Sequence, residues 1–131
     1  MMADERNPFE WVESLPPDCP PTDAEPPDNR EFFRLVGTIP PTDHDFDSNR
    51  KLRPGQPLGP DECMNRACSL WNTYQQCENK RKLPTLKMKK VVKLMLPPES
   101  GVILRTHRNS AGHHSWWRAM RFDPCAQWEM P

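Results

Sequence analysis

Residues 86–96 read Leu-Lys-Met-Lys-Lys-Val-Val-Lys-Leu-Met-Leu, and this stretch decides which fold the sequence predicts. Most even-numbered positions are apolar, whereas lysine occupies the odd-numbered positions 87, 89 and 93. Successive side chains of a β-strand point to opposite faces of the sheet. The alternation therefore indicates a strand in a sheet that has one buried face and one basic face.

Two more strand-like segments follow in the sequence, at residues 102–108 and 115–122. A Pro-Pro-Glu-Ser-Gly turn at 97–101 precedes the first of them, and a glycine-containing loop at 109–114 separates the two. Short connections join antiparallel neighbours, so the three segments are predicted to form a three-stranded antiparallel β-meander.

The segment 61–82 is predicted to form the main helix. Acidic residues follow Pro60 at its start and basic residues stand at its end, as the helix dipole favours. Its apolar residues recur at spacings of three and four, namely Met64, Ala67, Cys68, Trp71 and Tyr74. The expected fold class is therefore α+β, with one amphipathic helix packed on the three-stranded meander.

Residues 1–57 are expected to form a long proline-rich arm, largely extended or disordered. The chain of 131 residues contains 17 prolines, and proline removes amide donors and disfavours helix in the residue before it. Asp28 followed by Glu31 resembles a helix start, which predicts one short helix near 29–36. A compact module is expected at 58–124, with a tail at 125–131.

The net charge of zero hides a strong division of charge along the chain. Residues 1–50 carry twelve acidic and four basic side chains, whereas residues 51–131 carry six acidic and fourteen basic ones. Such asymmetry indicates an interaction surface, or an arm that folds back onto its own domain.

The cysteines and the N-terminus lead us to expect a cytoplasmic protein without metal or cofactor. No apolar run approaches the roughly 20 residues of a membrane span, and the N-terminus lacks a signal-peptide pattern. An odd number of cysteines without such a pattern predicts reduced thiols, namely Cys19, Cys63, Cys68, Cys77 and Cys125. Their spacing fits buried core thiols better than paired zinc ligands.

The basic sheet face is the strongest functional signal in the sequence. Clustered bases near aromatic side chains neutralise phosphates and stack on nucleobases, but edge lysines also keep sheets from pairing with one another. An acidic protein partner, or the chain's own acidic half, would fit the same face. The expected binding residues are Lys80, Arg81, Lys82, Lys87, Lys89, Lys90, Lys93, Arg105, Arg108, Trp117, Arg118 and Arg121.

The loop before the third predicted strand offers an alternative function. His107, His113 and His114 lie within eight residues, flanked by Arg105 and Arg108, and histidine and arginine can cleave RNA by acid–base chemistry without a metal. The Gly-His-His run resembles a short stretch of the messenger-RNA-cleaving toxins of the HicA kind, whose second helix after the sheet has no counterpart here. A polar hairpin loop with surface histidines is the competing interpretation.

The aromatic side chains supply the last candidates. Phe9, Trp11, Phe32 and Phe33 of the arm are expected to dock onto a partner or onto the protein's own core. One of Trp116 and Trp117 must face away from the other, because adjacent strand residues alternate, and Trp117 is taken as the contact residue. The predicted function is thus a non-enzymatic accessory protein that binds nucleic acid or an acidic protein and does not enter a membrane. The alternative is a small metal-independent ribonuclease.

Overall fold

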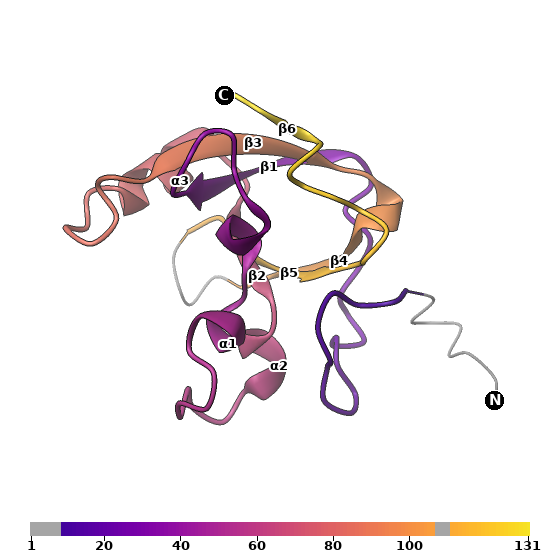
Figure 1. Ribbon diagram of the computed structural model, residues 1–131. Coiled ribbons are helices and arrows are strands. Elements are labelled where there is room, and N and C mark those ends of the chain that lie inside the picture. The colour runs from indigo at the N-terminus through magenta and orange to yellow at the C-terminus, as the bar shows by residue number, and fades with distance from the viewer. Residues whose placement is uncertain (1–8, 107–110) are drawn as a thin grey trace.

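The computed structural model describes residues 9–106 and 111–131, and most of the secondary structure there belongs to one antiparallel sheet (Figure 1). The sheet has six strands in the order β4-β5-β2-β1-β3-β6. The strands are β1 (Arg30–Val36), β2 (Cys68–Trp71), β3 (Lys90–Leu96), β4 (Gly101–Arg105), β5 (His113–Arg118) and β6 (Trp128–Glu129). The helices are short: α1 (Asn49–Leu52), α2 (Glu62–Asn65), α3 (Tyr74–Lys80) and the 3₁₀ turns η1 (Asp43–Phe46) and η2 (Pro98–Ser100).

The centre of the sheet is β1, which the sequence analysis placed in a short helix near 29–36. All seven of its residues pair with β3, from Arg30 opposite Leu96 to Val36 opposite Lys90, and Phe33 also pairs with Trp71 of β2. Phe32 and Phe33 are both buried although they point to opposite faces. A helix of this length buries one side only, whereas a central strand buries both, so the helix prediction is wrong.

The predicted helix at 61–82 is also wrong, because a strand interrupts it. The helix-like spacing places Cys68 and Trp71 on one helical face, but Cys68–Trp71 form β2 and pair with His113–Trp116 of β5. Leu70 is completely buried. Pairing with β5 satisfies the backbone of β2 and buries its side chains on both faces, and this tertiary gain outweighs a local helical pattern.

The three-stranded meander is replaced by a sheet with a different order. The second and third predicted segments do pair, as β4 and β5. However, β5, β2 and β1 lie between β4 and β3, although η2 alone connects these two strands in the chain. The fold is therefore a six-stranded antiparallel sheet with few short helices, because the front half inserts β1 and the predicted tail supplies β6.

The sheet curls around the main apolar core. Figure 1 shows β1, β3 and β6 arching above β4 and β5, and the core between them includes Phe32, Phe46, Leu94, Ile103 and Trp116. Each fully buried side chain of this size contributes roughly 1.5–3 kcal/mol to stability. Because the sheet is curled, its strands enclose most of this core, and Phe46 of η1 and Phe122 after β5 complete it.

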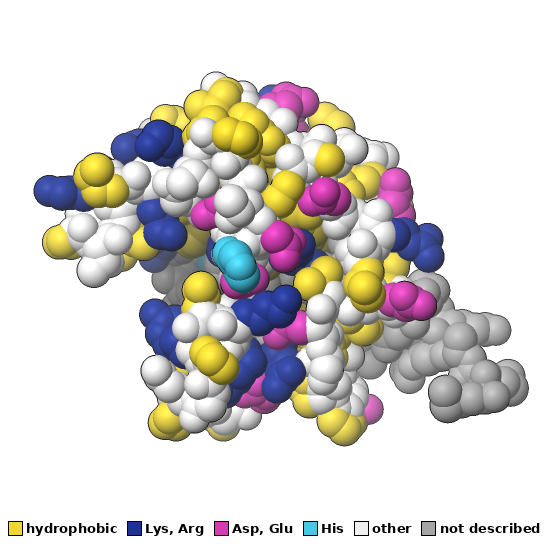
Figure 2. All heavy atoms as spheres, in the orientation of Figure 1, with side chains coloured by type: hydrophobic (Ala, Val, Ile, Leu, Met, Phe, Trp, Pro, Cys, Tyr) yellow, Lys and Arg dark blue, Asp and Glu magenta, His cyan; other side chains and the backbone are white. Residues whose placement is uncertain are grey.

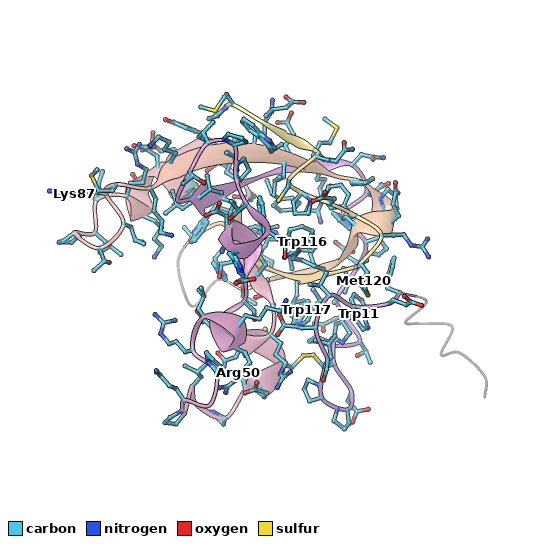
Figure 3. All side chains as sticks on the ribbon, in the orientation of Figure 1. Trp11, Arg50, Lys87, Trp116, Trp117 and Met120 are labelled. Atoms are coloured by element: carbon cyan, nitrogen blue, oxygen red, sulfur yellow. A yellow bond between two sulfur atoms is a disulfide. The ribbon has the colours of Figure 1, made fainter. Side chains whose placement is uncertain are left out.

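The convex face carries two smaller apolar clusters. One lies against α3 and contains Phe33, Leu35, Trp71, Cys77 and Val91. The other contains Val102 and Trp117 and is covered by the N-terminal segment through Phe9, Trp11 and Leu15. Figure 3 shows Trp116 and Trp117 on opposite sides of β5, with Trp11 beside Trp117.

The N-terminal segment is attached to the sheet at several points. Backbone hydrogen bonds join Glu25 to Ile103 of the β4 edge in both directions, at 2.9 and 2.8 Å. A disulfide links Cys19 to Cys63, which corrects the expectation that all five cysteines are reduced. Cys68 and Cys77 are buried free thiols. Within the described residues, every helix is too short or too polar to cross a membrane.

The central position of β1 generates a prediction about a fragment of residues 58–131. This fragment retains β2 and β3 but lacks the strand between them, so we expect it to unfold without a cooperative transition in denaturant. A chain of residues 9–131 should unfold cooperatively under the same conditions. Cooperative unfolding of the fragment, with strand circular dichroism, would support a folding unit that begins at residue 58.

The disulfide generates a second prediction. It closes a sequence separation of 44 residues, and native disulfides of this kind add roughly 2–4 kcal/mol to the free energy of unfolding. We expect the double change Cys19→Ser and Cys63→Ser to lower stability by about that amount in urea titrations. Cys125→Ser, which removes a half-buried free thiol, is the matched control, and an equal effect of both changes would contradict the disulfide.

Candidate functional site

A cleft of about 430 Å³ opens between the convex face of the sheet and the helices α1 and α2. Its floor consists of polar side chains from β2, β5 and the residue that follows β4, namely Ser69, His113, Ser115 and Thr106. The helical side contributes Asn49, Met64 and Asn65, and the α1–α2 connection contributes Leu58 and Pro60. Its volume lies within the roughly 300–1,000 Å³ of small-molecule sites.

The sheet register brings the floor residues together. Ser69 of β2 lies directly opposite Ser115 of β5, and Trp71 lies opposite His113. The Thr106 Oγ1 atom is 2.6 Å from His113 Nδ1 and 3.2 Å from Ser115 Oγ. The His113 ring also packs edge-on against Trp71, with ring centroids 5.3 Å apart. The result is a chain of two hydroxyls and one imidazole along the floor.

His113 is held in its neutral form. The pKa of His113 is lowered to about 4, mainly by burial, with smaller contributions from the charges of His114, Lys80 and Arg34. A neutral imidazole has one donor and one acceptor nitrogen. Since Nδ1 is engaged with Thr106, Nε2 is the ring atom that has no hydrogen-bond partner among the described residues.

An ion-pair network fixes the helical side of the cleft. The Arg50 guanidinium of α1 donates two hydrogen bonds of 2.7 Å to the Glu62 carboxylate of α2, and Arg66 donates a third of 2.8 Å. These donors, Arg50 first, lower the pKa of Glu62 to about 2. Asn65 donates to the carbonyl of Leu58 at 3.0 Å, which ties the connection to α2.

Arg34 fixes the floor from the opposite side of the sheet. Its guanidinium donates to the backbone carbonyls of Ser69 at 2.8 Å, Asp45 at 3.0 Å and Asp47 at 3.3 Å. These bonds tie β2 to β1 and to the loop that leads into α1. The position of Ser69 under α1 is therefore set by a side chain of the central strand.

A basic projection stands beside this cleft. We give this name to residues 80–90, which leave the end of α3 and return into β3. Lys82, Lys87, Lys89 and Lys90 form no ion pair with a described residue, and Met88 at the tip is 81% exposed. Figure 3 shows Lys87 at the outermost point of the projection, far from Trp117.

Figure 2 shows two groups of Lys and Arg side chains on one view of the molecule. The first group covers the basic projection at the upper left, and the second lies lower, on the lobe that α1 and α2 form, where Lys51 and Arg53 are exposed. The outline is indented between them. The exposed basic residues are therefore divided between several parts of the surface instead of covering one face of the sheet.

Several of the basic residues predicted to bind a partner are already engaged within the protein. Arg118 is buried, donates to the carbonyl of Phe46 at 3.1 Å and pairs with Asp43 at 3.1 Å. Lys93 pairs with Glu31 and Glu129, and Arg81 pairs with Glu78. Arg105 and Arg121 are exposed, and Arg108 lies outside the described residues.

Two of the three histidines of the ribonuclease alternative, His113 and His114, do not come together. His113 faces the cleft, whereas His114 faces the main core, where its ring packs against Phe32 at 5.1 Å and its Nδ1 donates to the carbonyl of Gly112. Adjacent residues of a strand point to opposite faces, which separates the two rings. His107 lies outside the described residues.

The aromatic residues of the arm dock onto the protein itself. Phe32 and Phe33 lie in β1 and are buried, and Phe9 and Trp11 pack on each other at 5.3 Å within the cluster of Trp117. Trp117 is 1% exposed, and its indole nitrogen donates to the carbonyl of Cys63. Trp117 was taken as the contact residue because it faces away from Trp116, but the N-terminal segment covers it.

The sequence analysis missed the cleft residues Ser69, Asn49 and Asn65. Ser69 could have been noticed as a polar residue between Cys68 and Leu70 in an apolar segment. The sequence analysis predicted a helix for that segment and so overlooked it. Nothing in the sequence marks Asn49 or Asn65 as site residues. They join the cleft because the register of β2 with β5 brings α1 and α2 over its floor. Comparison with models of protein families, with curated proteins and with solved structures finds no match.

The buried state of His113 predicts how stability depends on pH. Its folded pKa of about 4 lies below the unfolded value of roughly 6.5. The unfolded chain therefore binds the proton first, and stability should fall, by about 3 kcal/mol in total, as the pH falls through this window. Urea titrations of the parent and His113→Gln should show the smaller pH dependence in the variant. Equal dependence would show that His113 titrates normally.

Proposed function

We propose that the protein is a nucleic-acid-binding protein that contacts phosphates through the basic projection. The observation that carries this proposal is that Lys82, Lys87, Lys89 and Lys90 lie on a protruding segment without acidic partners among the described residues. Lysines of this kind bind phosphate by releasing the counterions that surround a nucleic acid.

The second basic group favours a long polyanion over a single anionic patch. Lys51 and Arg53 lie on the α1–α2 lobe, below the indentation, whereas the projection lies above it (Figure 2). A strand of nucleic acid carries a negative charge at every nucleotide and so reaches both groups. A stacking platform of exposed tryptophans does not contribute, because Trp116 and Trp117 are buried.

The described carboxylates of the acidic half form no ion pair with the lysines of the projection. Two of them pair with other bases, Glu31 with Lys93 and Asp43 with Arg118. This supports binding of an external partner at the projection.

The expected cytoplasmic location stays a prediction. Glutathione and thioredoxin keep cytosolic thiols reduced. A cytoplasmic protein would therefore hold Cys19 and Cys63 largely as neighbouring thiols, whereas the disulfide would persist in an oxidising compartment.

Salt dependence and charge removal test the proposed function. Four lysines that each neutralise one phosphate of a single strand give a slope of about −3 in a plot of log affinity against log salt. We expect fluorescence anisotropy with a mixed-sequence 12-nucleotide strand to show such a slope. The triple change Lys87→Ala, Lys89→Ala and Lys90→Ala should reduce it by about 2.

Arg121→Ala is the matched control, because Arg121 is exposed beyond the other end of β5. It should leave the slope nearly unchanged. Polyglutamate provides the second comparison. If the protein binds polyglutamate but not the oligonucleotide, its partner is an acidic protein and the proposal is wrong.

A further inference from the structure

We propose that the cleft receives an uncharged nucleoside portion of the bound strand, its base and ribose, while the flanking phosphates contact the basic groups. The inference rests on the proposed function, since it concerns the same strand. It assigns a second, chemically different subsite to residues that carry no charge.

The charges around the cleft point to a ligand that is neutral in its centre and anionic at its ends. The described lining residues include no lysine or arginine. A phosphate in the cleft would therefore find no such cation to bind among the described lining residues. Cations begin just outside it, because Lys51 and Arg53 follow Asn49 in the chain, and Lys80 lies close enough to His113 to lower its pKa.

The hydrogen-bonding groups of the cleft suit a nucleobase. The side-chain amides of Asn49 and Asn65 each present donor and acceptor atoms, and hydroxyls from Ser69 and Ser115 add groups that do both. Bases in single strands are recognised through such mixed patterns at their edges. His113 adds its Nε2 atom, whose role as donor or acceptor follows from the hydrogen bond between Nδ1 and Thr106.

The apolar part of the cleft suits the faces of a flat ring. Met64, Leu58 and Pro60 lie on the helical side, across from the hydroxyls of the floor. Bases that leave a stack are held between apolar side chains while polar groups contact their edges. A phosphate or a simple sugar would gain little from these three side chains.

The fixed geometry of the cleft supports binding in one orientation. Arg34 holds Ser69 through its backbone carbonyl, and the Arg50–Glu62 pair holds α1 on α2. A floor of polar side chains on a buried sheet face costs stability, and a sheet that served packing alone would place apolar residues there. The Ser115 hydroxyl is satisfied by Thr106 at 3.2 Å, whereas the Ser69 hydroxyl forms no hydrogen bond with a described residue and so has a use that packing does not explain.

Two strands of equal length test the inference together with the proposed function. The first is a mixed-sequence 12-nucleotide DNA, and the second is the same backbone with abasic sites throughout. We expect the parent protein to bind the abasic strand at least tenfold more weakly at one salt concentration. Ser69→Val fills the cleft floor and should bring the two affinities to within about twofold of each other.

The outcomes separate the two claims. If neither strand binds, the proposed function fails. If the abasic strand binds as tightly as the natural one, phosphate binding stands and the cleft inference fails. Asn49→Ala, at the exposed edge of the cleft, is a second variant for the case that Ser69→Val unfolds the protein. We expect Asn49→Ala to weaken binding of the natural strand and to leave binding of the abasic strand unchanged. Gln127→Ala, an exposed change near β6, should alter neither affinity.

Free nucleosides test the cleft without any phosphate. The ring signals of His113 are followed by NMR during titration with adenosine, cytidine, guanosine and uridine, and with glucose and inorganic phosphate. We expect at least one nucleoside to shift these signals saturably in the parent and not in Ser69→Val. The inference is overturned if no nucleoside does so, or if only glucose or phosphate shifts the signals.

Discussion

The pairing of β1 with β3 is the interaction on which the rest of the structure depends. Seven consecutive residues of each strand are matched, from Arg30 with Leu96 to Val36 with Lys90. Because β1 also borders β2, it joins the two halves of the sheet. Phe32 then lies in the main core and Phe33 under α3, so one strand supplies both faces with their central side chains. Without β1, neither β2 nor the cleft above it would be held in place.

The convex face shows how one sheet surface is divided between packing and a polar site. Trp71 and its cluster lie under α3, and Trp117 and its cluster lie under the N-terminal segment. Between them the side chains change to Ser69, Ser115 and His113, and the covering helices stand off the sheet to leave a cleft. Burial of polar groups is unfavourable unless they are hydrogen-bonded. The Thr106 hydroxyl meets this requirement for His113 and Ser115.

The opposite charges of the two halves have a partly structural explanation. Carboxylates of the front half neutralise selected bases of the back half: Glu31 lies 3.6 Å from Lys93, and Asp43 lies 3.1 Å from Arg118. Burial of Arg118 would be costly without its carbonyl and carboxylate acceptors. Exposed bases include those of the projection, Lys51 and Arg53 of the α1–α2 lobe, and Arg105 and Arg121. The charge asymmetry thus stabilises the sheet through these ion pairs, and other bases stay at the surface.

The sequence by itself determined local features: a strand ending at Leu96, which was predicted from residue 86 and begins at Lys90, the pairing of β4 with β5, the opposite directions of Trp116 and Trp117, and the cluster of lysines at 80–90. Each of these features depends on residues close in the chain or on the two-residue repeat of side-chain directions along a strand. Only the tertiary structure decided that residues 30–36 and 68–71 are strands, because their patterns fit a helix locally and their energy comes from partners far along the chain. The tertiary structure also decided where the cleft lies. Its lining includes residues far apart in the sequence, such as Asn49, Ser69 and Thr106. Strand register and the Arg50–Glu62 ion pair bring these segments together.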